Sequence, residues 1–325
     1  MRNDQVTVVM YHYVRELCDT RYPEIKGLNT SQFNKQIEFL GKYYSFITME
    51  ELIDAINQKC KLPNNPVLLT FDDGYIDHYT NVCPLLLKKG IQGSFFAPVK
   101  AIRNHEILTV NKIHFILASI QEKSNIVQSI FSHLDTLRHF YQLESNEYYY
   151  NKFAVANRLD TAEVIFIKRL LQVGLEEEIR TQIVNHLFNE FVGVEERIFS
   201  RELYMDVEQL RMMNKLGMHI GSHGYDHYWL GHLSREKQMI EIQQSINFLF
   251  DIGVKSDYLT MCYPYGDYNS DTLELLNQFN FNAAFTTEVD IFNINKIEKR
   301  LTIPRLDTND LPKEEHSLPN KWYVA

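Results

Sequence analysis

Two adjacent carboxylates, Asp72 and Asp73, directly follow a short apolar run in this sequence of 325 residues. The run, residues 67–71, comes after Pro66, and the acids come before Gly74. This pattern is typical of a strand that is buried on both faces and ends at the acids. At the C-terminal end of such a strand, the acids could serve as a metal ligand and a proton acceptor side by side. Either residue alone would more often be a helix N-cap, but two in tandem favour a site.

Two histidines, His223 and His227, follow a second predicted strand that begins at Met218 and breaks at a glycine. Their spacing of four residues would put both imidazoles on one side of a helical turn, an arrangement that suits a divalent metal ion. A lone histidine would be interpreted as structural. Two that leave a strand end in the same way as Asp72 and Asp73 favour metal binding.

The elements that must position these side chains alternate between strand and helix. Thr30 or Ser31, Thr48 and Ser234 are predicted to cap helices, Thr48 through a capping box with Glu51. About seven strands separated by helices, each ending in polar residues or glycine, indicate a (β/α) barrel. The strands are predicted at residues 6–11, 67–71, 93–98, from 218, 258–262, 282–286 and 301–306.

The alternation is interrupted over residues 102–201, where no strand is predicted and apolar residues keep helical spacing, as at Ile179, Ile183, Leu187 and Phe191. We therefore expect residues 1–101 and 202–325 to form the barrel, and residues 102–201 to form a helical insertion. The insertion follows a strand whose C-terminal end shares the rim of the site, which predicts a cap. A homodimerisation arm is the alternative, because apolar helix faces also serve association.

The amino-acid composition argues against some classes of partner and location. The sequence has 33 basic and 42 acidic residues and a net charge of −9, which argues against a nucleic-acid partner. No signal core and no run of about 18 apolar residues is visible, so we expect no membrane span and a cytoplasmic location. The four cysteines are scattered and are expected to be free thiols.

Three motifs in order carry a family resemblance: TFDDG at residues 70–74, SHGYDH at 222–227 and YPYG at 263–266. They resemble the motif set of the polysaccharide deacetylases, the carbohydrate esterase family 4 or NodB-homology enzymes. Residues 10–14 and 303–307 resemble the subgroup that acts on poly-N-acetylglucosamine-like polymers. The resemblance covers about residues 5–101 and 205–310, and it implies a distorted (β/α)7 barrel of the NodB-homology type.

The resemblance also implies roles for individual residues. Asp72 would be the catalytic base, and Asp73, His223 and His227 would bind one divalent ion. The backbone amide of Tyr265 would stabilise the oxyanion. Two imidazoles and a carboxylate suit zinc, or another transition metal, better than calcium or magnesium. Three protein ligands leave coordination positions of the ion open for a water molecule and the amide oxygen of a substrate.

The sequence also departs from the family pattern. Gly224 stands where serine or threonine is usual, and Cys262 stands where an arginine often occurs. The late tryptophan-bearing motif is not visible, and the leucine-x-histidine motif, whose histidine is the general acid, is missing. His12 is therefore the candidate acid, and Arg305 is the candidate to orient Asp72. A packing role is the alternative for each.

We therefore expect a metal-dependent hydrolase that removes N-acetyl groups from a glycan or a glycan precursor. A cap would favour a small, lipid-linked or nucleotide-linked N-acetyl sugar over a mature polymer. One alternative is a catalytically weak homologue that binds sugar or a partner through the insertion. Another is a hydrolase of a different linear amide C–N bond, since the fold does not determine the substrate.

Overall fold

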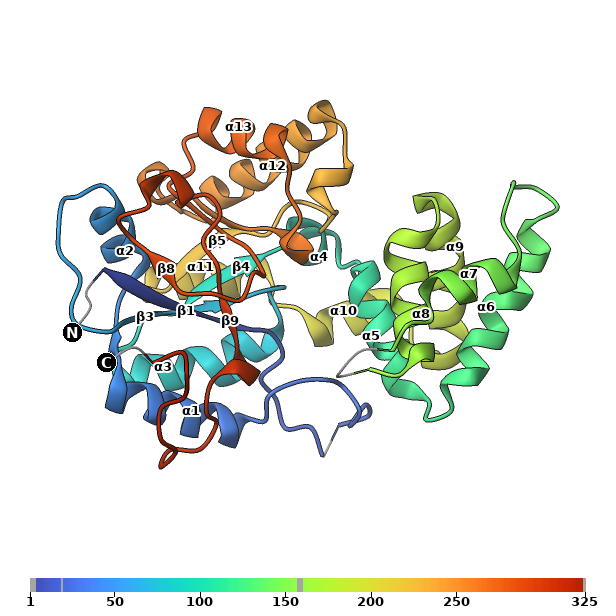
Figure 1. Cartoon of the computed structure of the whole chain (residues 1–325), viewed down its shortest axis with the longest axis horizontal. Helices are drawn as coiled ribbons and strands as arrows, with labels where there is room; N and C mark the ends of the chain where they lie inside the picture. Colours follow the sequence, from blue (N-terminus) through green and yellow to red (C-terminus); the bar gives the residue numbers. More distant parts are fainter. Residues whose placement is uncertain (1–3, 19, 157–159, 324–325) are drawn as a thin grey trace. The chain divides into compact units, whose positions relative to one another are not determined.

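The structure, a computed structural model, describes residues 4–18, 20–156 and 160–323. The chain forms two compact units (Figure 1). Unit 1 comprises Met1–Glu16, Gly27–Glu106 and Ser200–Ala325, and unit 2 comprises Leu17–Lys26 and Ile107–Phe199. Unit 2 therefore includes an N-terminal segment that the sequence analysis had placed with the barrel.

Unit 1 is built on one curled sheet whose neighbouring long strands are parallel. The order is β7-β6-β5-β4-β3-β1-β8, with β2 beside β3 and β9 beside β1. All pairs are parallel except β1 with β8. The strands are β1 (Gln5–Tyr11), β2 (Ser45–Phe46), β3 (Pro66–Phe71), β4 (Ser94–Ala97), β5 (His219–Ser222), β6 (Thr260–Cys262), β7 (Ala283–Phe285), β8 (Phe292–Asn293) and β9 (Leu306–Asp307).

The segment that ends in β9 contacts both β7, at one end of the strand order, and β1, near the other end. Ile303 forms a parallel bridge with Phe285 of β7, and Leu306 pairs in parallel with Val9 of β1. The sheet therefore curls round on itself, and the predicted distorted (β/α) barrel is confirmed. The predicted strand over 301–306 is wrong except at its last residue, because β9 comprises only Leu306–Asp307 and Ile303 forms an isolated bridge. The short strands β2 and β8 were not predicted.

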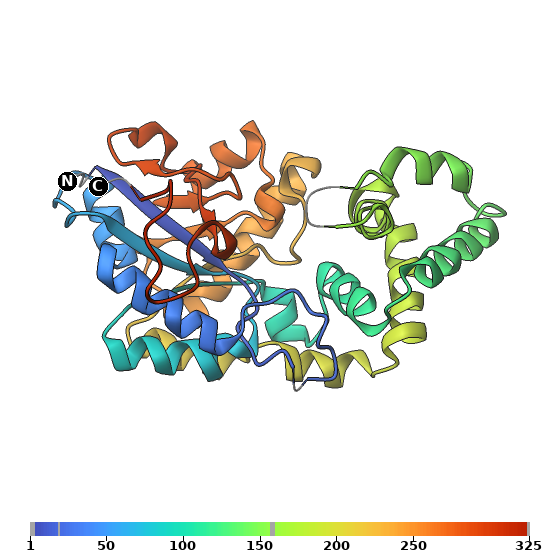
Figure 2. The ribbon, with the colours of Figure 1, turned by 60° about the horizontal axis from the view of Figure 1, so that its bottom comes forward.

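Helices cover the outside of this sheet (Figure 2). The capping box of Thr48 and Glu51 is present at the start of α2, and Ser234 caps α12, as predicted. The predicted cap of α1 is wrong, because Asn29, not Thr30 or Ser31, is the N-cap residue, and its Oδ1 accepts from the amide of Ser31 at 3.0 Å. The helices are α1 (Thr30–Tyr43), α2 (Met49–Ile56), α3 (Cys83–Lys89), α4 (Val99–Asn104), α11 (Val207–Lys215), α12 (Arg235–Asp251) and α13 (Ser270–Gln278).

Unit 2 is helical, and no strand occurs in its described part. Ile179, Ile183 and Leu187 of α9 are buried, where α9 packs on α5 and α6 of the same unit. These three side chains are thus covered inside the unit, whereas Phe191, the fourth residue of the predicted face, is only partly buried. The dimerisation arm stays a prediction. The helices are α5 (Thr109–Ser119), α6 (Lys123–Leu137), α7 (Asn146–Phe153), α8 (Ala162–Arg169), α9 (Glu177–Leu187) and α10 (Glu196–Leu203), which runs on into unit 1.

No helix in the described ranges has the length and apolar character needed to cross a membrane.

Candidate metal centre

The turn after β3 positions the two adjacent aspartates. The amide of Asp72 still donates to the carbonyl of Tyr11 on β1, at 2.9 Å, so the ladder holds Asp72 at the strand end. Asp73 then takes a left-handed conformation with φ 73°, followed by Gly74 with φ 66°. A Cβ on Gly74 would come within 3.0 Å of the Cβ of Ala97, so this close turn requires glycine. Both aspartates are buried.

The two histidines lie on an irregular loop after β5, not on a helical turn. Gly224 has φ 75° and His227 has φ 58°, and these left-handed residues turn the chain back on itself. The helical explanation of the spacing was therefore wrong, although both imidazoles do meet. Glu241 of α12 fixes the loop, because its Oε2 accepts from the amides of Tyr225 and Asp226 at 3.0 and 2.9 Å.

Three ligand atoms converge in the described part of the chain. The Nε2 atoms of His223 and His227 each lie 3.3 Å from Oδ1 of Asp73, and all three residues are buried. No other group of three such side chains in the described ranges could hold an ion. Ligands at the corners of a tetrahedron with bonds of about 2.1 Å lie about 3.4 Å apart, so this spacing fits a metal ion.

A hydrogen bond prepares His223 as a ligand, whereas Nδ1 of His227 is buried without a hydrogen-bond partner among the described groups. Nδ1 of His223 donates to the carbonyl oxygen of Cys262 at 2.8 Å, which leaves the lone pair of its Nε2 available. Oδ1 of Asp73 is buried without a hydrogen-bond partner among the described groups. Burial alone would raise the pKa of Asp73, but His223 and His227 hold that pKa well below its usual range, so the carboxylate is anionic at neutral pH.

Asp72 forms a buried ion pair with Arg305. Nη1 and Nη2 of Arg305 donate to Oδ1 and Oδ2 of Asp72 at 3.0 and 2.7 Å. Nε of Arg305 donates to the carbonyl of Thr286 at 2.8 Å, which fixes the guanidinium plane. Burial alone would raise the pKa of Asp72, but Arg305 and then His223 lower it to about 2. Cys262 on β6 lies beside this pair, with its Sγ 3.1 Å from Nη1 of Arg305.

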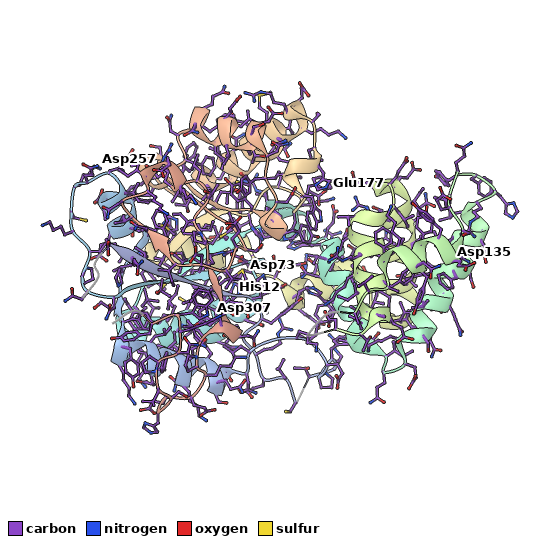
Figure 3. All side chains as sticks on the ribbon, viewed as in Figure 1. His12, Asp73, Asp135, Glu177, Asp257 and Asp307 are labelled. Carbon is purple, nitrogen blue, oxygen red and sulfur yellow. The ribbon has the colours of Figure 1, made fainter. Side chains whose placement is uncertain are left out.

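His12 follows β1 and is half-buried. It is close enough to Asp72 and Asp73 for its electrostatic interaction to lower the pKa of both, and Figure 3 labels it near Asp73 in that view. The backbone carbonyl of His12 lies 2.9 Å from Nε2 of His78. Because a carbonyl can only accept, that nitrogen of His78 carries the proton.

Tyr265 occupies the short turn Pro264–Gly266 after β6, in a left-handed conformation with φ 59°. Its ring centroid is 4.8 Å from that of His227, and it stacks on Trp229 at 4.4 Å. Three left-handed residues other than glycine are thus linked by contacts, because His227 lies against both Asp73 and Tyr265. Such backbone strain commonly gathers at functional sites.

Two residues that hold this centre, Tyr75 and Glu241, were not predicted from the sequence. Tyr75 donates its hydroxyl to Oδ2 of Asp73 at 2.5 Å, and Glu241 anchors the histidine loop. Tyr75 stands next to the TFDDG motif, so its position was a usable signal. Glu241 lies 16 residues from Tyr225 along the chain, and no local pattern marked it.

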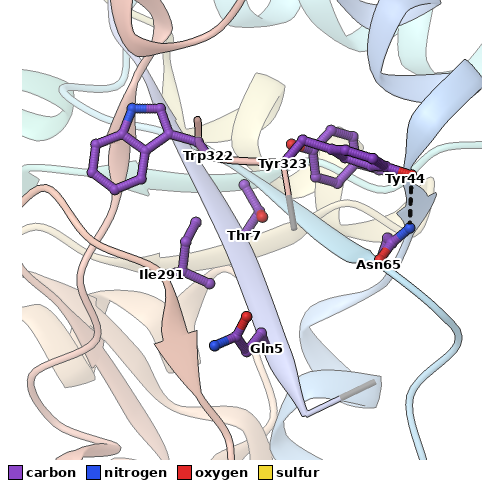
Figure 4. Close-up of a pocket in the computed structure, with 7 residues that line it drawn as sticks. All are labelled: Gln5, Thr7, Tyr44, Asn65, Ile291, Trp322 and Tyr323. Atoms are coloured by element: carbon purple, nitrogen blue, oxygen red, sulfur yellow. Dashed lines mark hydrogen bonds between the residues drawn. The ribbon is translucent and has the colours of Figure 1, made fainter. Parts of the chain in front are cut away.

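A small cavity of about 10 Å³ lies away from the metal ligands (Figure 4). It has room for about one water molecule and cannot hold a sugar. It is lined by Gln5, Thr7, Tyr44, Asn65, Ile291, Trp322 and Tyr323.

Comparison with known proteins gives a family match. A family model described as polysaccharide deacetylase matches residues 59–135 and 181–284, more than half of the chain. The curated protein named "Putative polysaccharide deacetylase YxkH", of Bacillus subtilis (strain 168), is 29% identical over 106 residues. That alignment covers 32% of this chain and only 36% of the relative.

Solved structures share the fold. The deacetylase PplD of Streptococcus pyogenes, solved in complex with acetate, matches with a TM-score of 0.56 and 16% identity, over 93% of this chain and 92% of that one. IcaB from Ammonifex degensii matches with a TM-score of 0.53 and 20% identity, over 94% and 92% of the two chains. At these identities the likeness concerns the fold.

Proposed function

Because the chain belongs to the polysaccharide deacetylase family, we propose that it is a metal-dependent hydrolase that removes N-acetyl groups from an N-acetylated glycan or glycan precursor. One observation carries the proposal. Asp73, His223 and His227 bring three ligand atoms together, beside a separate carboxylate, Asp72, that is ionised and held in place. Amide hydrolysis needs both a group of metal ligands and a separate ionised base.

Asp73, His223 and His227 would hold one divalent ion, for which zinc or another transition metal is the best match to two imidazoles and one carboxylate. The ion would polarise the acetyl carbonyl and lower the pKa of a water molecule towards about 7.

Asp72 would accept the proton of the attacking water as that water adds to the N-acetyl carbon. The bidentate contact with Arg305 supports this role, because it keeps the carboxylate oriented and deprotonated at neutral pH. Arg305 acts through Asp72 and is therefore a positioning residue.

Two further roles complete the proposal. His12, beside Asp73, would donate a proton to the leaving amine. The backbone amide of Tyr265 would donate to the oxyanion of the tetrahedral intermediate. The left-handed turn at Tyr265 and the contact of its ring with His227 support its place in the site.

The substrate we propose is an N-acetylated sugar or oligosaccharide. PplD, which has the same fold, was solved with acetate, and acetate is the product that N-deacetylation releases. The subgroup resemblance at residues 10–14 and 303–307 supports a poly-N-acetylglucosamine-like sugar unit, in a short or carrier-linked form.

Mass spectrometry of acetate release tests the proposal. Purified protein, stripped of metal and then supplied with zinc, would be incubated with N-acetylated oligosaccharides of increasing length and with sugar nucleotides. We expect acetate and a free amine from at least one glycan, only after metal is restored. Release that is equal with and without metal, or no release from any glycan while another linear amide is cleaved, would contradict it.

A further inference from the structure

The two oxygens of Asp73 have different partners. Oδ1 lies 3.3 Å from each imidazole Nε2 of His223 and His227. Oδ2 points instead to the hydroxyl of Tyr75, at 2.5 Å. One oxygen is thus left for an ion, and the other is already used by a protein donor.

Tyr75 is held where it donates this bond. Its ring is fully buried and stacks on Tyr13, with centroids 3.9 Å apart and an interplanar angle of 20°. The ring of Tyr75 is also nearly parallel to the ring of Tyr204, with an interplanar angle of 9° and centroids 6.1 Å apart. The backbones of Tyr75 and Tyr204 also form an antiparallel bridge.

A second contact fixes the turn itself. The amide of Met205 donates to the carbonyl of Gly74 at 2.9 Å. Asp73, Gly74 and Tyr75 are therefore tied to the segment that follows α10. The hydroxyl of Tyr75 cannot swing away without disturbing the stacked rings.

We propose that Tyr75 is a positioning residue that restricts Asp73 to a single ligand oxygen, Oδ1, and so sets how tightly the centre holds its ion. The inference rests on the metal site proposed above. A carboxylate free to turn can present both oxygens to an ion, a mode that larger, oxygen-seeking ions such as calcium accept. One oxygen with two imidazoles gives the compact set that zinc prefers. Partners that orient a ligand in this way change metal affinity or activity by about 10- to 100-fold.

The alternative is that Tyr75 only fills space. Tyr75→Phe separates these explanations, because it keeps the stacked ring and removes only the oxygen. Tyr204→Phe is the matched control, since it removes a hydroxyl from the same aromatic stack, and the donor to Oδ2 of Asp73 is Tyr75.

The dissociation constant for zinc would be measured by competition with a chelator of known affinity, in the absence of any sugar. We expect Tyr75→Phe to weaken zinc binding by about 10- to 100-fold, and Tyr204→Phe to change it less than about twofold. Equal zinc affinity in the wild type and Tyr75→Phe, or equal losses in both variants, would overturn the inference. Deacetylation is not needed for this readout, so a wild type that binds zinc but releases no acetate would count against the proposed function alone.

A second measurement needs no variant. In a crystal structure of the zinc-loaded wild type, we expect Oδ1 as the only Asp73 atom at bonding distance, about 2.0–2.2 Å, with Oδ2 still bonded to Tyr75. Two Asp73 oxygens on the ion would overturn the inference, even if Tyr75→Phe failed to fold.

Discussion

The carboxylate of Asp72 is a buried charge whose partner is also buried. Removing two charges from water is costly, and the cost is offset only where the geometry is good and the remaining polar atoms are bonded. Arg305 meets both conditions, with two parallel bonds to Asp72 and a third to the carbonyl of Thr286. Loss of either partner alone would leave the other charge unpaired.

Arg305→Met should therefore lower the free energy of unfolding by roughly 3–5 kcal/mol. The double variant Asp72→Asn with Arg305→Met should recover much of that loss, because no charge remains uncompensated, yet it should stay inactive. Urea denaturation of the two single variants and the double variant measures this. Purely additive losses would show that the pair is not coupled.

The roles of the adjacent acids can be separated. Asp72→Asn should keep the metal and lose activity by about a hundred- to ten-thousand-fold, the usual worth of general-base assistance. Asp73→Asn should lose the metal itself. Metal content and acetate release, measured on both variants at a temperature where each is folded, would test the assignment. Equal metal loss in the two variants would refute it.

Among individual residues, the sequence predicted those whose type and order in a motif indicate their function. Asp72, Asp73, His223 and His227 stand at predicted strand ends in recognisable motifs, and the structure brings them together. Tyr75 and Glu241 could not be assigned in the same way, because their roles are hydrogen bonds to particular atoms, which exist only after the chain has folded.

The loop that carries the histidines depends on a helix. Oε2 of Glu241 on α12 accepts from the amides of Tyr225 and Asp226, and the amides of Val99 and Lys100 on α4 donate to the carbonyls of Gly224 and Tyr225. An unpaired backbone N–H is costly when it is removed from water. The position of His223 and His227 is therefore coupled to α12.

Glu241→Leu should lower the free energy of unfolding by about 1–3 kcal/mol, because it removes the acceptor of two backbone amides. It should also weaken zinc binding at least tenfold, since the loop would no longer hold its shape. Gln244→Leu, an exposed position on the same helix, is the control and should change neither. Unaltered zinc affinity in Glu241→Leu would mean that the loop does not need the helix.

A pH-dependent contact joins α2 to β5. Burial alone would raise the pKa of Glu50, but His219 and Gln92 lower it to about 2. Because the pKa of Glu50 is lower in the folded chain, the unfolded chain binds a proton first as the pH falls. The contribution of ionised Glu50 to folding stability is therefore complete above about pH 4.5 and is lost as the pH falls towards 2.

Wild-type stability should therefore fall more steeply between pH 5 and about pH 2.5 than that of Glu50→Gln. Urea midpoints at these pH values provide the comparison. Glu298→Gln, at an exposed position, should behave like the wild type. Identical pH profiles for wild type and Glu50→Gln would contradict the assignment.

Helices and strands could be predicted where several consecutive residues form a recognisable sequence pattern. The buried run before Asp72 predicted β3 with nearly correct bounds, and the capping box at Thr48 predicted where α2 begins. The two-residue strands β2 and β8 could not be found, because two residues show no periodicity and their pairing depends on partners distant in sequence. The left-handed loop at Gly224 was wrongly predicted as a helical turn, because the spacing of two histidines does not specify the backbone conformation between them.

At the scale of the molecule, the helical unit takes about a hundred residues that a barrel connection does not need. Its own core buries the apolar face of α9, so its helices do not depend on an outside partner to cover that face. The sequence predicted its helical character, but it could not predict that residues 17–26 join it, because that segment is remote in the chain.

Replacing Ile107–Phe199 and Leu17–Lys26 with short linkers tests the predicted role of the unit. If it acts as a cap, longer N-acetylated oligosaccharides should become better substrates relative to short ones, with no change in oligomeric state. Acetate release against chain length, together with light scattering, measures both. A dimer that becomes a monomer with unchanged length preference would support the dimerisation arm instead.

We propose that deacetylation depends on an ion held by Asp73, His223 and His227. The most direct test of this proposal is acetate release by metal-stripped protein titrated with zinc, beside the variant His223→Ala with His227→Ala. We predict that wild-type activity rises to a plateau at one equivalent of zinc and that the variant binds no stoichiometric zinc and releases no acetate. A variant that retains zinc, or a wild type that is fully active without metal, would contradict the account.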